Sequence, residues 1–297
     1  MSLSQRLGFF AALGCYIIWG LLPLYFKVLA HVSPENMLAH RIVWSLPTGI
    51  ILIALARNWD DVRAALTVER VAWLMFSGVL IGINWWVYIW AVGQDRVMEA
   101  SVGYYILPLL NVLLGFVFFQ ERLRLMQWVA VAIAAIGVAV MTIALGRFPW
   151  VAIVLTVTFG IYSVVRKKLQ VDGRAGFIIE VAVLVLPAMV WLAMSDAPLF
   201  ANGGWDVPLL LAAGPITAVP LILFALAAKR LALSTVGMMQ YIGPTLQFLI
   251  SLAFGETFGR FHAFGFAFIW LALIVFTIDS IRGDAKARRL ARAAEVA

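Results

Sequence analysis

The chain has 297 residues and a mean hydropathy of +0.99; 64% of its residues are hydrophobic and only 12% are charged. A soluble domain of this length cannot bury so much apolar surface in one core, and a single cysteine (Cys15) cannot form the internal bridge of a disulfide scaffold. The net charge of +7 falls mostly in short loops and the C-terminal tail, where membrane topology explains it better than nucleic-acid binding does. We therefore predict a polytopic membrane protein whose partners are the lipid bilayer and a small molecule, with no nucleic acid.

Ten apolar segments follow one another along the chain, most of them close to the 20 or so residues that a membrane-crossing helix needs. None alternates with period two, as the strands of a membrane barrel do. The first lacks a signal-peptide cleavage site and is interpreted as an uncleaved helix. We predict an all-α membrane protein with ten transmembrane helices. They are expected at residues 7–30, 37–56, 71–92, 100–119 and 128–145, then at 149–165, 177–194, 208–227, 235–254 and 263–281.

Lysine and arginine are distributed unevenly among the loops. If the N-terminus is cytoplasmic, 17 of these residues lie in cytoplasmic segments and only three, Arg96, Arg147 and Arg260, lie in the loops on the other side. Cytoplasmic loops of membrane proteins carry such an excess of positive charge. An even number of helices puts the C-terminus on the same side. Both termini are therefore predicted to be cytoplasmic.

The chain contains a weak internal repeat. A shift of 136 residues aligns the third and fourth segments with the eighth and ninth, and a shift of 140 aligns the first with the sixth. Each half then has five helices, an odd number, so the halves must be inverted relative to each other. Inverted repeats are common in secondary transporters, although a duplication without transport is the alternative. We predict repeats at 1–145 and 146–281 and a basic tail at 282–297. The matches at the first shift include Gly78 with Gly214, Tyr105 with Tyr241, Pro108 with Pro244 and Phe118 with Phe254; an acid also ends each of the two helices, Glu121 and Glu256.

Several stretches resemble one known family. They are residues 13–20 with 25–27, His-Arg-Ile-Val-Trp-Ser at 40–45, Ile-Gly-Ile-Asn-Trp at 81–85, Glu-Ala-Ser-Val-Gly-Tyr at 99–104, Val-Arg-Lys-Lys at 165–168 and Gln-Tyr-Ile-Gly-Pro-Thr at 240–245. Together they resemble the RarD branch of the EamA transporters, within the drug/metabolite transporter superfamily. The resemblance covers nearly the whole chain. It implies ten helices as two inverted five-helix repeats in the bacterial inner membrane, exporting small metabolites or drugs, and it does not identify the solute.

Polar and aromatic side chains within the apolar segments are the candidates for a substrate cavity, because a polar group in the bilayer needs a partner or a water-filled space. Lys27 and Arg41 could equally extend to the nearby interface, and Trp or Tyr near helix ends are often interface anchors. Trp19, Trp73 and Trp128 are assigned to packing or anchoring. The candidates for the cavity are Tyr25, Lys27, His40, Arg41, Trp44, Asn84, Trp85, Tyr88, Tyr104, Tyr105, Asn111, Tyr162, Glu180, Gln240, Tyr241 and Gln247.

Two prolines at matching places are candidate hinges. A proline cannot donate the helical hydrogen bond to the carbonyl four residues before it. Pro108 therefore frees the carbonyl of Tyr104. In the second half, Pro244 frees that of Gln240. Such carbonyls favour a bend or a contact with a ligand, so we predict that both prolines take part in the transport cycle.

Glu180 is the one acid inside a predicted helix away from its last residues, apart from Asp279. A carboxylate is too short to reach the interface easily, so we expect it to face inward with a partner or a proton. A cavity-lining role is favoured. Proton coupling is a hypothesis, and a salt bridge that makes Glu180 a structural lock is the alternative.

The function predicted from these features is a secondary transporter that exports small organic solutes by alternating access. The chain has no phosphate-binding loop for a nucleotide, and no His or Cys cluster for a metal, so neither cofactor nor metal is expected. The aromatic cavity favours amphipathic or zwitterionic metabolites. A membrane-embedded enzyme or lipid-handling protein using the same cavity is the alternative, although no catalytic constellation supports it; a passive channel is another. The fifth and tenth helices carry fewer polar groups, which suits peripheral packing or the contacts of a homodimer.

Overall fold

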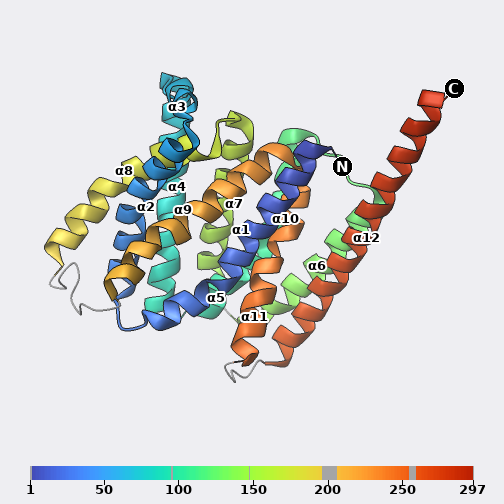
Figure 1. Cartoon of the computed structure of the whole chain (residues 1–297). Coiled ribbons are helices and arrows are strands. Elements are labelled where there is room, and N and C mark those ends of the chain that lie inside the picture. Colours follow the sequence, from blue (N-terminus) through green and yellow to red (C-terminus); the bar gives the residue numbers. More distant parts are fainter. Residues whose placement is uncertain (1, 95, 147, 196–205, 254–258, 297) are drawn as a thin grey trace.

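The computed structural model describes residues 2–94, 96–146, 148–195, 206–253 and 259–296. Every regular element in these ranges is a helix (Figure 1), which confirms the predicted all-α fold. Arg147, Phe254 and Glu256, named above, lie outside the described residues. The helices are α1 (Leu3–Val28), α2 (Pro34–Ala56), α3 (Trp59–Ala65), α4 (Val68–Gly93), α5 (Val97–Phe119), α6 (Leu125–Ala144), α7 (Trp150–Leu169), α8 (Gly173–Met194), α9 (Asp206–Arg230), α10 (Leu233–Gln240), α11 (Ile242–Ala253) and α12 (Arg260–Val296).

Within the described residues, nine helices are long and apolar enough to cross a membrane, and they correspond to nine of the ten expected segments. The remaining segment, 235–254, was predicted as one helix but is divided at Tyr241 into α10 and α11. The break lies close before Pro244, which cannot donate a hydrogen bond back to Gln240. In contrast, α5 continues through Pro108. At the other boundary, α12 continues beyond residue 281, so the predicted tail is an extension of the last helix.

Local signals set the helix ends. The Ser33 side chain accepts a hydrogen bond from a backbone N–H of α2, and Pro34 occupies the first turn, where its missing N–H is harmless. Asp172 caps α8 by accepting from the backbone N–H of Arg174 and Ala175. These signals place short turns between long apolar helices, so the helices pack side by side as a bundle.

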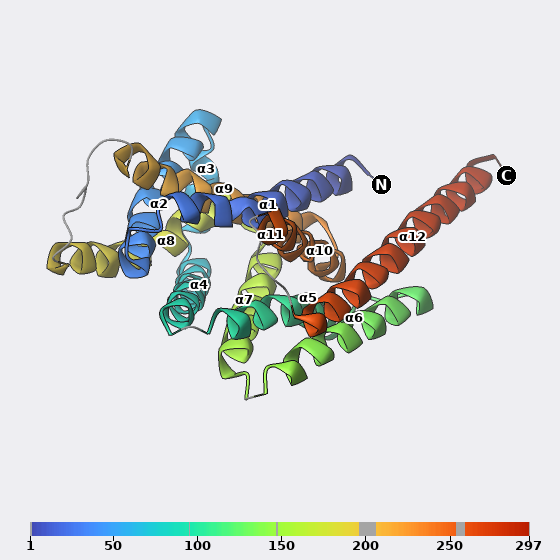
Figure 2. The same cartoon turned by 90° about the horizontal axis from the view of Figure 1, so that it is seen from below.

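The first helix begins, and the last one ends, at the same end of the bundle, which we call the terminal end (Figure 1). Helices of one half pack mostly on helices of the other: α1 on α9 and α11, α2 on α8 and α9, α4 on α7 and α8, and α5 on α7 and α10. In the predicted repeat, α1, α2 and α4 correspond to α7, α8 and α9, and α5 corresponds to α10 and α11. Replacing each helix by its counterpart gives the same set of packed pairs. α6 and α12 run along each other at the edge of the bundle (Figure 2).

Glycines at equivalent positions form equivalent helix crossings. A Cβ on Gly78 would lie 2.5 Å from the carbonyl oxygen of Glu180, and a Cβ on Gly214 would lie 2.2 Å from that of Trp44. Both members of the first crossing are thus offset from those of the second by 136 residues, the shift found in the sequence. Small residues allow such close approach of membrane helices. The same contact made twice supports an architecture of two inverted repeats.

Two hydrophobic clusters fill the bundle. The larger includes Tyr16, Phe159, Tyr162 and Phe224 and lies among the inner helices of both halves. The second includes Tyr105, Tyr241 and Phe266 and joins α5 and α10 to the α6–α12 pair. The inner helices therefore surround the middle of the molecule, whereas α6 and α12 are attached from one side.

Candidate functional site

A cavity of about 160 Å³ lies between the two halves, and its walls are mostly aromatic and apolar. The rings contact one another: Trp19 and Phe159 have centroids 5.7 Å apart, and Tyr88 and Tyr104 5.8 Å apart, both pairs edge to face. The break between α10 and α11 opens onto this space. The cavity is lined by Tyr16, Trp19, Leu22, Pro23, Phe26, Arg41, Asn84, Trp85, Tyr88, Ser101, Tyr104, Phe159, Thr217, Leu221, Gln240, Gly243, Pro244 and Gln247.

Arg41 brings a positive charge into this wall. Its side chain is largely buried, and its Nε donates a hydrogen bond of 3.0 Å to Oγ1 of Thr217 on α9. The guanidinium carbon lies 5.1 Å from the ring centroid of Trp85 and 5.6 Å from that of Phe26. Contacts with aromatic faces stabilise a cation without neutralising it. The charge of Arg41 therefore remains available to the cavity.

The amide side chains of the cavity are held in fixed orientations. Nδ2 of Asn84 donates to the carbonyl of Leu155 at 2.8 Å and to Oγ1 of Thr158 at 2.9 Å, which joins α4 to α7. Gln240 accepts a hydrogen bond from Asn111 at 3.1 Å. Because these side chains already have protein partners, they form a fixed part of the cavity wall.

A second cavity of about 290 Å³ extends from the first towards the end of the bundle opposite the terminal end. It is bordered by the turn between α1 and α2, including Leu29 and Val32. Phe26, Arg41 and Tyr88 line both cavities and stand at their junction. A solute that reached the central cavity from this end would pass these three side chains.

Seven of the 16 predicted cavity residues line the central cavity, and nine do not. Residues from both chain halves meet there, although they are as far apart in sequence as Arg41 and Gln247. The predicted residues that line the central cavity are Arg41, Asn84, Trp85, Tyr88, Tyr104, Gln240 and Gln247, together with the candidate hinge Pro244.

Four of the other predicted residues lie on α1 and α2 away from the central cavity. The Tyr25 hydroxyl donates to the carbonyl of Leu209 at 2.9 Å. Trp44 Nε1 donates to Nδ1 of His40 at 3.2 Å, within one helix. Lys27 is exposed in the last turn of α1. Tyr25 thus joins α1 to α9, the His40–Trp44 hydrogen bond stays within α2, and Lys27 faces outward.

A further group lies where α5 meets α10. The hydroxyl of Tyr241 donates to the carbonyl of Tyr105 at 3.0 Å, and both rings belong to the second hydrophobic cluster. Asn111 supports Gln240 from outside the cavity. Pro108 lies inside the continuous part of α5. This group positions the broken helix without lining the cavity.

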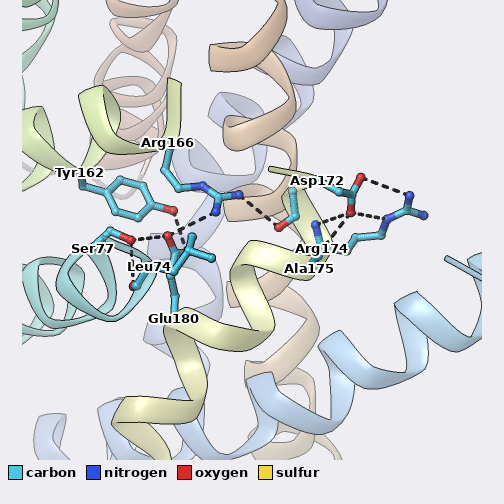
Figure 3. Close-up of polar contacts among 9 residues, drawn as sticks. Leu74, Ser77, Tyr162, Arg166, Asp172, Arg174, Ala175 and Glu180 are labelled. Atoms are coloured by element: carbon cyan, nitrogen blue, oxygen red, sulfur yellow. Dashed lines mark hydrogen bonds and ion pairs between the residues drawn. The ribbon is translucent and has the colours of Figure 1, made fainter. Parts of the chain in front are cut away.

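Glu180 and Tyr162, expected at the cavity, lie instead in a buried polar cluster beside the turn between α7 and α8 (Figure 3). Ser77 donates to Glu180 Oε1 at 2.6 Å, and Tyr162 donates to Oε2 at 3.4 Å. Arg166 Nη1 lies 3.4 Å from Oε1, in an ion pair whose side chains are only 2% and 3% exposed. Nη2 of Arg166 donates to the carbonyl of Gly173. The cluster ties α4, α7 and α8 together. It includes the salt bridge on which the structural-lock alternative for Glu180 depends, and proton coupling stays a hypothesis.

A second ion pair lies next to this cluster along the chain. Lys167, the neighbour of Arg166, lies 3.3 Å from Glu121 at the end of α5. The Glu121 carboxylate also accepts hydrogen bonds from the backbone N–H groups of Leu233 and Ser234, and so caps α10. Consecutive cations at the end of α7 therefore pair with Glu180 on α8 and with Glu121 in the turn after α5.

Sequence reasoning missed several lining residues, including Trp19, Phe159, Ser101 and Thr217. Trp19 was assigned to packing or anchoring, yet it lies in the middle of α1, where interface anchors are uncommon. Thr217 is a polar residue within an apolar segment, the same signal that selected Gln240. No sequence signal separated Phe159 from the many other apolar residues that only pack.

Comparison with known proteins gives consistent matches. Residues 6–143 match the EamA-like transporter family. An uncharacterized transporter of Vibrio cholerae is 45% identical over 293 residues, covering 96% of this chain and 97% of the relative. Protein RarD of Escherichia coli is 42% identical over 284 residues, covering 94% and 96%. A solved crystal structure, titled only as that of a protein, has a TM-score of 0.72 at 23% identity and covers 93% of this chain and 97% of its own, a likeness of fold.

Proposed function

Because the chain belongs to the RarD branch of the EamA-like transporter family, we propose that it is a secondary transporter, not an enzyme, that exports small organic solutes across the bacterial inner membrane. The observation that carries the proposal is the central cavity between the two halves, whose lining residues come from both. Substrate sites of repeat-built transporters lie at such interfaces. An aromatic wall with one charge and several amides suits an amphipathic organic solute better than an inorganic ion.

We infer that transport proceeds by alternating access. The support is that the two ends of the helical bundle differ in structure. The second cavity continues from the central one towards the opposite end, whereas the Arg166–Glu180 and Lys167–Glu121 pairs join helices at the terminal end. With the terminal end in the cytoplasm, as the loop charges predict, this arrangement corresponds to the outward-facing side of the cycle.

The test is a comparison of metabolites in the medium of a deletion strain, a strain overexpressing the wild type and a strain overexpressing Ser101→Phe, which places a ring in the cavity wall. Leu211→Phe, at a lipid-facing position that is 40% exposed, is the matched control. We expect the wild type and the control to enrich the same metabolites and Ser101→Phe to enrich none. Equal enrichment by all three proteins would contradict transport through this cavity.

The enriched metabolite then allows a carrier to be separated from a channel. In proteoliposomes a carrier gives a saturable flux and counterflow, in which unlabelled solute inside accelerates the entry of labelled solute. A flux that rises linearly with concentration and shows no counterflow would contradict alternating access.

A further inference from the structure

Arg41 is the only charged residue that lines either cavity within the described part of the chain. No carboxylate among the described residues forms an ion pair with it. Among the described residues, the Arg41 side chain donates one hydrogen bond, from Nε to Oγ1 of Thr217 on α9. The two terminal nitrogens, which form the fork that binds carboxylates, are not engaged by this bond.

A buried charge without a counter-charge is costly, and inside a membrane it marks a functional site by default. The contrast with Arg166 is direct: that residue is also buried, and the protein supplies Glu180 as its partner. The faces of Trp85 and Phe26 offset part of the cost for Arg41 but add no negative charge. The counter-charge for Arg41 is therefore expected from the ligand.

The shape of the cavity limits the rest of the ligand. Its volume of about 160 Å³ is close to that of an engineered protein cavity, about 150 Å³, that holds benzene. The rings of Trp19 and Phe159 offer flat apolar contact. A dianion such as a phosphate ester would need more cationic donors than one guanidinium supplies, whereas a monoanionic carboxylate matches its two parallel N–H groups.

Resting on the proposed transport function, we propose that the substrates are organic carboxylates with an apolar body about the size of benzene, and that Arg41 binds the carboxylate. Thr217 is a positioning residue, because its hydroxyl holds Nε and so directs the terminal nitrogens towards the cavity. The junction position of Arg41 makes it accessible to the carboxylate from both cavities.

The first test needs no variant. Purified protein in nanodiscs is titrated calorimetrically with benzoate, with benzamide, which has the same shape without the charge, and with benzylamine, which reverses the charge. We expect saturable binding of benzoate, at least about tenfold tighter than that of benzamide, because a hydrogen bond to a charged group contributes more than a neutral one. No binding of benzylamine is expected. Equal affinities for benzoate and benzamide, or no binding of any probe, would overturn the proposal.

The second test assigns the preference to Arg41. Arg41→Gln should abolish the difference between benzoate and benzamide, and Arg41→Lys should retain a reduced preference, because an ammonium keeps the charge without the planar fork. Lys27→Gln, which removes an exposed cation from the neighbouring helix, is the matched control and should behave as the wild type. Retention of the full preference by Arg41→Gln would place the carboxylate elsewhere and refute the assignment.

The outcome of these binding tests does not depend on the outcome of the transport test. If the metabolite comparison and counterflow identify a neutral or cationic solute while benzoate fails to bind, the carboxylate proposal fails and the transporter remains. If benzoate binds through Arg41 but no metabolite is enriched and no counterflow occurs, the binding site stands and the transport proposal fails.

Discussion

Two arginines within the helical bundle have opposite surroundings. Arg166 has an acid, a carbonyl and a shared cluster of hydroxyl donors around it, whereas Arg41 has aromatic rings and one hydroxyl. Neither arrangement follows from the sequence. Both residues are cations near the end of an apolar segment, and the partner of Arg166 lies on the next helix, beyond a turn. Hydropathy identifies such residues as exceptional, but packing determines which of them has a counter-charge.

The ion pair between Arg166 and Glu180 should behave as one energetic unit. Removing one charge from a buried pair leaves the other uncompensated, at a cost of about 3–5 kcal/mol. Glu180→Gln and Arg166→Gln should therefore each lower the thermal unfolding temperature markedly, while the double variant loses much less than the two single losses combined. Thermal unfolding of the purified proteins measures this cycle.

The matched control is Arg63→Gln. Its pair with Asp60 is formed by side chains that are 79% and 93% exposed, so little effect on stability is expected. Additive losses in the double variant of Arg166 and Glu180 would contradict coupling between these two residues.

At the scale of helices, most of the fold is predictable because a membrane span needs only length and apolar composition. The break at Tyr241 is the exception. The two prolines present the same local pattern, Tyr-x-x-Pro, yet α5 continues through Pro108 and the counterpart helix is divided before Pro244. The two sites differ locally, because Gly243, a poor helix former, precedes Pro244 where Leu107 precedes Pro108. They also differ in packing, because Pro244 lines the cavity and Pro108 does not. The role of both prolines in transport stays a prediction.

Replacing the two prolines should have unequal effects on turnover. Pro244→Ala restores a donor for the carbonyl of Gln240 and favours one continuous helix, so we expect slower counterflow at an unchanged protein level. Pro108→Ala restores a hydrogen bond inside a helix that is already continuous, and a smaller effect is expected. Initial rates in proteoliposomes decide between them; a larger loss for Pro108→Ala would refute the importance of the break.

The glycine crossings should be intolerant of a single added methyl group. Gly78→Ala and Gly214→Ala each place a Cβ within 2.5 Å of a backbone oxygen, so two helices must separate. We expect both variants to lose several degrees of thermal stability. Gly14→Ala is the control, because its Cβ would meet only a leucine methyl at 3.4 Å. Wild-type stability of Gly78→Ala and Gly214→Ala would show that the crossings are looser than described.

At the scale of the whole molecule, the repeat follows from the sequence more securely than the cavity does. Gly78 and Gly214 coincide when the sequence is shifted by 136 residues, and the helix crossings that they form in the structure are equivalent. The sequence does not indicate in the same way which face of a helix points to the cavity. Trp19 and Tyr105 are both aromatic residues of apolar segments, yet Trp19 lines the cavity and Tyr105 packs against the α6–α12 side.

The predicted topology can be tested at the C-terminus. A reporter that is active only in the periplasm, fused after Val296, should remain silent, because the excess of positive charge keeps that end of α12 in the cytoplasm. The same reporter inserted after Gly146, in a loop expected outside, is the positive control. Activity of the C-terminal fusion would contradict an even number of spans.

If the ion pairs at the terminal end hold it closed in the proposed cycle, they have a consequence for the response to temperature. Opening that end would expose the Arg166–Glu180 pair to water, and the hydration of charged groups carries a strongly negative entropy. Water therefore competes less effectively for the two charges as temperature rises. Warming should therefore increase the fraction of molecules in which the ion pair is formed. The rate of transport should then rise with temperature less steeply than in a variant that lacks this pair.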